Sequence, residues 1–389
     1  MFTLIRSLTP PLLGLVFLML ASGLFNTFVS IRLDIEGYST EVIGLLTSVF
    51  YAGILIGSLK IDRWIAKVGH TYAFMVLAGI STASVLMQAI WINPWYWAFF
   101  RFIGGICLSG IFIVVESWLL MQSGPQKRGT ALSIYLAVFY GALSGGQLLI
   151  KISDPMTLSP FCIAAILSAL SILPLTFKTN GAPKLEKHDA LTPIQLFKAS
   201  PFGFVGSVVS GAVLGTIYGL IPVYAKDIGM SVSQIGTLMA VVVFGGLSLQ
   251  WPLGLWGDKG NRRRALYTAS FLSAVFAIGI TLTSATSWLL LILAWFFGGF
   301  SFTIYPLSMA YACQKFQESE IVAATGGFVL SYSIGAVVGP FLASVAMGHF
   351  GHLSLFYFLA GVSLALGAIG VFGREEKKEL TRENTEKDG

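Results

Sequence analysis

The sequence predicts an all-α membrane protein with 12 transmembrane helices. Twelve apolar runs of about 20 residues fill most of the chain, and each is long enough for a helix to cross about 30 Å of hydrocarbon. Charged residues make up only 11% of the 389 residues, against about 25% in typical soluble proteins. A soluble fold has no reason to repeat such runs, so we expect the lipid bilayer to surround most of the chain.

The predicted spans form two sets of six, separated by a longer polar segment. The first set covers 9–31, 40–60, 71–92, 95–121, 129–150 and 157–177, and the second covers 201–224, 231–253, 265–284, 287–311, 322–347 and 353–373. Turn-forming residues such as Gly37 and Gly229 lie between spans. We therefore expect one six-helix bundle at 1–177, a cytoplasmic linker at 178–200, a second six-helix bundle at 201–373 and a charged cytoplasmic tail at 374–389.

Basic residues predict the orientation of the spans, because cytoplasmic loops carry an excess of Lys and Arg. With a cytoplasmic N-terminus, the 24 Lys and Arg residues all lie in cytoplasmic segments except for Arg101 within a span and Arg32, Lys151 and Lys226 in outer loops. This bias explains the net charge of +6 without any nucleic-acid partner. It predicts a multi-pass protein of the bacterial inner membrane with both termini in the cytoplasm.

Aromatic and histidine side chains near the span ends are expected at the water interface. Trp91, Trp95, Trp97 and Trp288 lie at predicted outer ends, as the residues of an aromatic belt do. The histidines, among them His70, lie in loops or at span ends without the spacing of metal ligands. We expect them to be solvated, and we expect no metal site.

The segments after the second and eighth spans resemble each other. The first reads Gly57-Ser58-Leu59-Lys60-Ile61-Asp62-Arg63, and the second reads Gly254-Leu255-Trp256-Gly257-Asp258-Lys259-Gly260-Asn261-Arg262-Arg263. Both resemble the Gly-x-x-x-Asp-Arg-x-Gly-Arg-Arg signature of the major facilitator superfamily, although the first copy has Ser58 where the signature has glycine. The resemblance implies two pseudo-symmetric six-helix bundles and a monomeric secondary transporter that works by alternating access.

The same resemblance assigns a gate to these two segments. In the family they latch the two halves together on the cytoplasmic side, and the plainer alternative is a basic loop that only sets orientation. The expected latch residues are Asp62, Arg63, Lys67, Arg128, Gly254, Asp258, Arg262 and Arg263. Shorter matches resemble the YcaD-like branch of bacterial major facilitators: Glu116-Ser117-Trp118-Leu119, Gln250-Trp251-Pro252-Leu253-Gly254 and Phe302-Thr303-Ile304-Tyr305-Pro306.

Two ionisable residues, Arg101 and Glu116, lie inside the fourth span, where such groups are costly and point to function. Helical geometry offsets them by about 60° and about 22 Å along the axis, so both can face one water-filled cavity. Arg101 can attract an anion or act on a nearby acid, or it can be a structural arginine. Glu116 can carry a coupling proton, or it can form a gate salt bridge with Arg63 or Arg128.

Polar side chains on the spans that line the central cavity in this family are candidates for solute binding. They are Ser22, Asn26, Arg101, Tyr140, Gln147, Tyr218, Gln250, Tyr305 and Tyr332. Each can equally form an inter-helix hydrogen bond. Such a cavity is aromatic and weakly polar with one fixed cation, which favours an amphipathic or anionic organic solute over a sugar.

These observations predict a secondary active transporter of a small organic solute, coupled to protons, with efflux favoured over uptake. The alternatives are an uptake symporter or facilitator for a metabolite or siderophore-like compound, and a transport-inactive receptor or scaffold with the same fold. A phosphate-binding Gly-x-x-x-x-Gly-Lys-Ser/Thr loop is absent from the sequence, so we expect no ATP and no other cofactor. The spans offer no cluster of catalytic groups, so we expect no enzyme.

Overall fold

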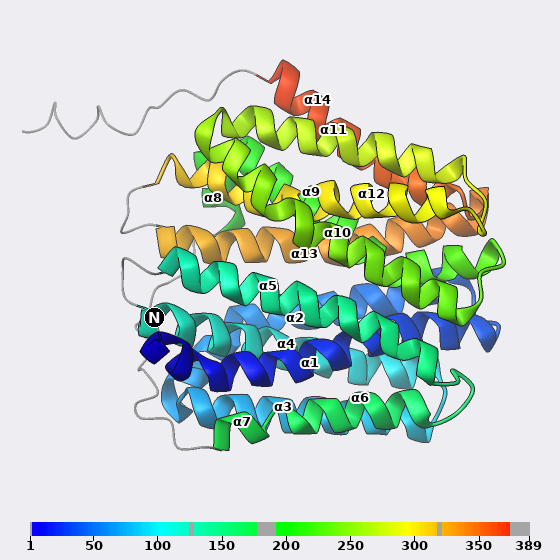
Figure 1. Cartoon of the computed structure of the whole chain (residues 1–389), viewed down its shortest axis with the longest axis horizontal. Coiled ribbons are helices and arrows are strands. Elements are labelled where there is room, and N and C mark those ends of the chain that lie inside the picture. Colours follow the sequence, from blue (N-terminus) through cyan, green and yellow to red (C-terminus); the bar gives the residue numbers. More distant parts are fainter. Residues whose placement is uncertain (1, 124–127, 177–191, 317–320, 374–389) are drawn as a thin grey trace, which may run out of the picture.

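The computed structural model describes residues 2–123, 128–176, 192–316 and 321–373, with side chains left out at 2–8, 128–130 and 321–323 (Figure 1). The described part holds 12 helices long and apolar enough to cross a membrane, which confirms the predicted number of spans. Hydrocarbon offers no hydrogen bonds, so each spanning segment must satisfy its backbone internally, as a helix does.

The first half of the chain forms one bundle and the second half another. The first comprises α1 (Phe2–Ile35), α2 (Thr40–Val68), α3 (His70–Ile90), α4 (Pro94–Ser123), α5 (Arg128–Leu148), the 3-10 turn η2 (Leu149–Ile152), α6 (Ser159–Leu170) and α7 (Leu173–Thr176). The second comprises α9 (Pro201–Asp227), α10 (Val232–Lys259), α11 (Arg262–Thr281), α12 (Trp288–Cys313), α13 (Ile321–Phe350) and α14 (Ser354–Phe372), with the short α8 (Pro193–Ala199) before it.

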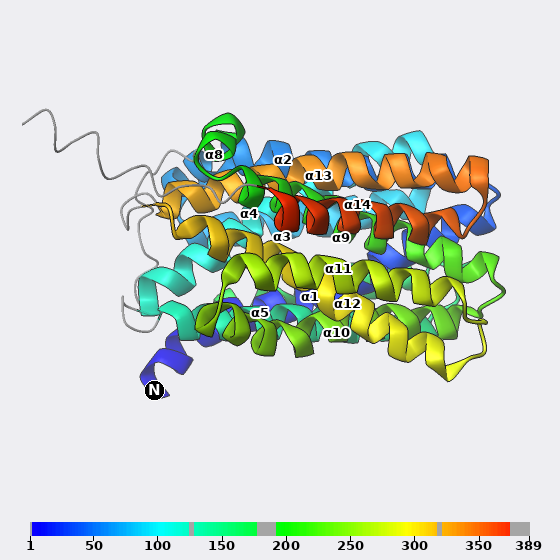
Figure 2. The same ribbon diagram turned by 90° about the horizontal axis from the view of Figure 1, so that it is seen from above.

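The two bundles pack side by side along a seam. Figure 1 shows the second bundle above the first, with α13 and α10 facing α2 and α5. Figure 2 shows the start of α1 and the short α8 at the same end of the molecule. We call it the basic end, because the last part of α2, with Lys60 and Arg63, and the first turn of α11, with Arg264, also lie there. The other end, where α1 meets α2 and α9 meets α10, is called the far end.

Several helices run beyond the predicted spans. The first ends at Ile35 rather than at 31, so Arg32 lies on a helix instead of in a loop. The second and the eighth spans continue to Val68 and Lys259, so both predicted latch segments are largely helical. These extensions carry charged residues such as Arg32, Lys67 and Lys259, so a hydropathy pattern does not separate them from loops. Within the predicted linker 178–200, residues 177–191 lie outside the described part, as does the tail at 374–389.

The aromatic side chains at the far end divide into two groups. Trp91, Trp95 and Trp288 are 60%, 68% and 73% exposed, as expected at an interface. Trp97 differs from the expectation: it is fully buried, and its indole N–H donates to the carbonyl oxygens of Gln88 and Trp91. The last carbonyl groups of α3 have no partner within the helix, and the Trp97 indole N–H supplies one, which keeps this side chain buried.

His70 also differs from the expectation. This residue begins α3, and its side chain is 1% exposed. Its Nε2 lies 2.9 Å from the hydroxyl of Ser117 on α4. The ring of Trp118 meets the imidazole edge-on at 6.1 Å. This histidine therefore helps to join α3 to α4 and is not a solvated loop residue.

Close backbone contact between α2 and α4 gives a stability prediction. A Cβ at Gly53 would meet the Phe102 carbonyl, whereas a Cβ at Gly79 on α3 would meet nothing within 4 Å. We expect Gly53→Val to destabilise the protein by about 1–3 kcal/mol because it overpacks a helix crossing. Thermal unfolding in detergent measures this, with Gly79→Val as the control. Equal melting temperatures for the two variants would contradict the packing argument.

Candidate functional site

The far end of the seam is closed by contacts between the bundles. Lys226 at the end of α9 forms an ion pair with Asp34 at the end of α1. Farther along the seam, the Ser144 hydroxyl of α5 donates to the Ala240 carbonyl of α10 at 2.9 Å. Neither member of the ion pair was among the residues selected from the sequence, because each reads as an ordinary charge at a span end.

Arg32 supports the same end of the structure from within the first bundle. Its guanidinium is buried, pairs with Glu36 at 2.7 Å and donates to the Pro155 carbonyl at 2.7 Å. These bonds fix the end of α1 to the segment before α6. They hold Asp34, two residues further on, in place for Lys226.

Tyrosines from both bundles gather halfway along the seam. The rings of Tyr140 and Tyr218 each meet Phe302 edge-on, at 5.4 Å and 5.8 Å between centroids. Tyr305 meets Tyr332 in the same way at 5.3 Å. The structure thus brings together four of the predicted cavity residues, from α5, α9, α12 and α13, two of them against Phe302 and two against each other. All four tyrosines are partly buried.

Two tyrosines that sequence reasoning missed join this layer. The hydroxyls of Tyr51 on α2 and Tyr332 on α13 share a hydrogen bond across the seam. Tyr135 on α5 donates a hydrogen bond to the Glu116 carboxylate on α4. We define the tyrosine layer as Tyr51, Tyr135, Tyr140, Tyr218, Tyr305 and Tyr332. A polar tyrosine at mid-span depth was the only signal in the sequence for the two missed members.

Glu116 lies at the edge of the tyrosine layer. It is partly buried and interacts electrostatically with Tyr305 of the second bundle as well as with Tyr135. Among the described side chains no ion pair joins Glu116 to Arg63, and Arg63 is exposed. The other predicted gate partner, Arg128, has a side chain outside the described part. The carboxylate therefore faces hydroxyls rather than a described cation.

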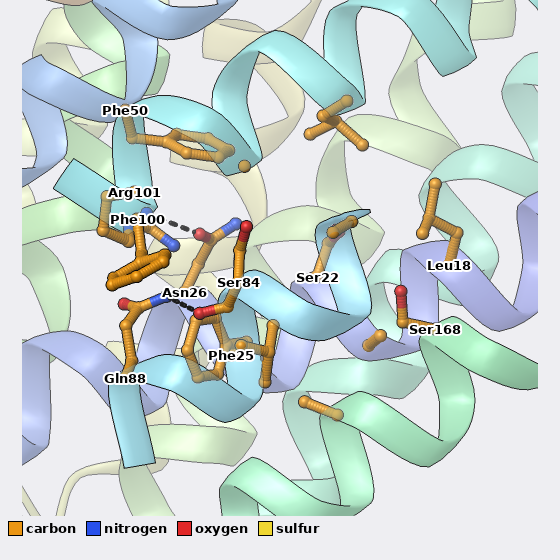
Figure 3. Close-up of a pocket in the computed structure, with 16 residues that line it drawn as sticks. Leu18, Ser22, Phe25, Asn26, Phe50, Ser84, Gln88, Phe100, Arg101 and Ser168 are labelled. Carbon is orange, nitrogen blue, oxygen red and sulfur yellow. Dashed lines mark hydrogen bonds between the residues drawn. The ribbon is translucent and has the colours of Figure 1, made fainter. Parts of the chain in front are cut away.

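Arg101 faces the interior of the first bundle. Its Nη2 donates to Asn26 Oδ1 at 2.8 Å, and the guanidinium lies over the Phe50 ring at 4.1 Å (Figure 3). Ser22 and Asn26 line the same cavity, whereas Glu116 is not among its lining residues. The single cavity expected to hold both Arg101 and Glu116 is therefore divided: one group lies inside the first bundle and the other at the seam.

The two predicted glutamines occupy different surroundings. Gln147 is fully buried on α5, and its side-chain oxygen accepts a hydrogen bond from Thr27 of α1. It thus fits the inter-helix alternative. Gln250 is partly buried on α10, beside Trp251, which is 75% exposed.

The second latch segment makes its described bonds within the second bundle. Asp258 pairs with Arg262 at 2.9 Å, and Arg262 also donates to the Ala310 carbonyl of α12 at 2.8 Å. Arg263 Nε donates to the Gly370 carbonyl of α14 at 2.9 Å. A Cβ at Gly254 would meet nothing within 4 Å.

The first latch segment lies on the end of α2. Arg63 and Lys67 are exposed, and Asp62 is partly buried with no hydrogen-bond partner at Oδ1. In this structure the described ion pair that joins the bundles is therefore at the far end. The arrangement is that of a seam closed at the far end.

Twelve spans in two bundles, joined at one end and meeting in a polar layer at mid-depth, define a multi-pass membrane transporter. Two stretches of the chain, 12–227 and 203–388, match the family model described as Major Facilitator Superfamily. The chain belongs to this superfamily, and it is a secondary transporter.

Relatives and solved structures agree with this assignment. The chain is 34% identical to the uncharacterized MFS-type transporter YcaD of Escherichia coli O7:K1 (strain IAI39) over 93% of this chain and 94% of the relative. It is 33% identical to YcaD of Escherichia fergusonii over 90% and 91%. The predicted resemblance to the YcaD-like branch is thereby confirmed.

Solved structures share the fold at low sequence identity. The nucleoside transporter NupG superposes with a TM-score of 0.77 at 14% identity, over 95% of this chain and 100% of that one. The D-xylose–proton symporter gives 0.74 at 14% identity, over 96% and 98%. The human organic anion transporter MFSD10 gives 0.68 at 15% identity, over 94% and 99%. These likenesses establish the fold alone.

The Asp34–Lys226 pair gives a testable prediction about the seam. We expect Asp34→Asn to favour opening at the far end, because a partly exposed ion pair contributes about 0.2–1 kcal/mol. Labelling of Thr47→Cys, buried at the seam against Gly219, by a membrane-impermeant maleimide should rise by up to about 5-fold in a background without native cysteines.

The charge-swapped double variant Asp34→Lys with Lys226→Asp is the control for this experiment. It restores the pair in reverse and should return labelling to the starting level. Labelling that stays raised in the swapped variant would show that the pair does not hold the seam.

Proposed function

We propose that this transporter moves a small amphipathic or anionic organic solute across the bacterial inner membrane by alternating access, coupled to protons, with efflux favoured. The observation that carries the proposal is the tyrosine layer with Glu116 at its edge. It contains side chains from both bundles at mid-depth. A solute bound there touches both halves, so rocking of one bundle against the other exposes it to alternate sides.

The chemistry of the layer supports the class of solute. Six tyrosine rings offer apolar faces for stacking and hydroxyls for a few hydrogen bonds. Sugars need many amide and carboxylate partners, whereas the layer consists of tyrosines, with the Glu116 carboxylate beside Tyr135 and Tyr305. A molecule with a flat apolar body and a polar or anionic edge fits best. The solved relatives, named for nucleosides, D-xylose and organic anions, show that one fold serves several solute classes.

The position of Glu116 supports proton coupling. The carboxylate accepts a hydrogen bond from Tyr135 and interacts with Tyr305 across the seam, so its proton affinity depends on how the bundles are placed. When the bundles move, the surroundings of this carboxylate change, and a proton can be taken up on one side and released on the other. Efflux follows when the proton enters as the solute leaves.

Closure of the seam at the far end indicates which gate is closed in this structure. With the predicted orientation, which puts both termini and the basic end in the cytoplasm, closure at the far end supports an inward-facing state. Asp34–Lys226 acts as the outer gate, and the two latch segments form the cytoplasmic gate in the opposite state. Arg263 and Asp258 are bonded within the second bundle in this structure. These bonds fix the second latch segment in place, ready to meet the first latch segment in the opposite state.

Glu116→Gln tests the proton coupling. We expect this variant, reconstituted in proteoliposomes, to lose at least about 10-fold of solute movement driven by a pH gradient, because an amide cannot carry the proton. Exchange of labelled for unlabelled solute without a gradient should persist. Asp154→Asn, which removes an exposed carboxylate from a loop, is the matched control. Intact gradient-driven transport in Glu116→Gln would exclude this role, and movement that ignores the gradient in the wild type would indicate a facilitator.

Tyr332→Phe tests the solute site. Loss of one hydroxyl that is bonded across the seam should raise KM by about 2- to 10-fold, because a neutral hydrogen bond contributes about 0.5–1.5 kcal/mol. Tyr72→Phe, on a side chain that is 55% exposed on α3, should leave KM unchanged. A metabolite panel in the same proteoliposomes supplies the solute. If no compound moves while one stabilises the protein, the chain is a receptor.

A further inference from the structure

A cavity is lined only by helices of the first bundle, and no member of the tyrosine layer lines it. Its lining comes from α1, α2, α3, α4 and α6 and includes the polar side chains of Ser22, Asn26, Ser84, Gln88, Arg101 and Ser168 (Figure 3). The cavity offers about 50 Å³ to water-sized molecules. One water needs about 10–15 Å³ by this measure, whereas pockets for organic ligands run to about 300–1,000 Å³. It therefore fits a small ion with a few waters and excludes the organic solute.

The charge in this cavity is not balanced by any carboxylate that lines it. Arg101 is 6% exposed, and a guanidinium keeps its proton in proteins. Its described polar partner is the neutral side-chain oxygen of Asn26, and the faces of Phe50 and Phe25 lie 4.1 Å and 5.9 Å from it. Ring faces and an amide attract a cation without neutralising it. A buried unpaired charge is costly, and a bound anion removes that cost.

Polar atoms of the cavity also lack partners. Arg101 Nε and the Ser168 hydroxyl, on side chains 6% and 2% exposed, make no hydrogen bond in the described structure. Both are donors. The Gln88 side-chain oxygen, on a residue 1% exposed, also lacks a partner and is an acceptor. The free Arg101 Nε donor and the free Gln88 acceptor line the same cavity and match an anion accompanied by water, with the water donating to Gln88. The Ser168 hydroxyl lies away from Arg101 in Figure 3, so it matches a further water rather than the anion.

We infer that this cavity binds a small inorganic anion of halide size, held by the guanidinium of Arg101. The anion neutralises Arg101 within the first bundle, behind the Phe50 ring. The adjacent residue on α2, Tyr51, belongs to the tyrosine layer and bonds to Tyr332 across the seam. Binding of the anion beside Phe50 can therefore shift α2 and change the contact of Tyr51 with the second bundle. The inference does not depend on which solute is carried or in which direction.

Thermal unfolding of the full chain in detergent tests this site. Sodium chloride or bromide replaces sodium gluconate at constant ionic strength, because gluconate is too large for the cavity. We expect Tm to rise with the logarithm of the halide concentration above the Kd, by roughly 2 °C at ten times the Kd. Arg101→Gln should abolish this halide-specific rise. Arg264→Gln, which removes an exposed arginine at the start of α11, should keep it.

A second variant keeps the test decisive if Arg101→Gln does not fold. Gly104 lines the cavity, and a Cβ there would meet nothing within 4 Å. Gly104→Ala therefore places a methyl group in open space and should raise the half-saturating halide concentration several-fold while the protein still folds. Gly361→Ala, at an exposed position on α14 that is equally open, is its matched control.

The outcomes separate the possible sources of the anion. A halide response that is lost in Arg101→Gln and weakened in Gly104→Ala supports the site. A response to sodium formate but not to chloride would overturn the halide assignment in favour of a carboxylate group, such as one on the solute. Identical halide curves in the wild type and both cavity variants, or no halide-specific rise in Tm in the wild type, would overturn the site itself.

Discussion

Hydrocarbon cannot hydrogen-bond, and the rest of this structure follows from that constraint. Backbone groups must be satisfied within each span, which leaves only helices, and polar side chains inside the membrane must find partners within the protein. The described hydroxyls of Ser144, Ser207 and Tyr135 bond to carbonyls or to a carboxylate on other helices. The exceptions are informative: a buried polar atom without a partner marks a position where a ligand, an ion or water can bind.

The seam between the bundles is built unequally along its length. Its far end carries an ion pair, Asp34–Lys226, and its middle carries hydroxyls and aromatic faces. Its basic end carries the two latch segments, and the charged residues of the second segment form their described bonds within the second bundle. This gradient suits alternating access, because a few weak contacts at each end can be exchanged without disturbing the packed interior of either bundle.

Helix α2 connects the two polar regions of the molecule. Phe50 lies over the Arg101 guanidinium inside the first bundle, and the next residue, Tyr51, reaches Tyr332 of the second bundle. Close packing of Gly105 against the Phe50 carbonyl holds α2 and α4 together at this level. The charge state around Arg101 and the contact between the bundles therefore share one rigid crossing. An anion bound in the first bundle and a solute bound at the seam are separated by two adjacent side chains of α2.

The sequence by itself determined the number of spans and the family, and it singled out polar residues in the middle of the spans. Each of these depends on hydropathy or on a local motif, which act along the chain. Tyr140, Tyr218, Tyr305 and Tyr332 could be selected in this way because a polar group in an apolar run stands out wherever its helix is placed.

Only the tertiary structure decided which of these groups face one another. In a membrane both the lipid-facing and the buried sides of a helix are apolar, so periodicity does not reveal the inner face. The sequence therefore could not show that Arg101 faces the interior of the first bundle while Glu116, on the same helix, lies at the seam. For the same reason the partners Tyr51, Tyr135 and Lys226 became visible only when helices far apart in the chain were packed together.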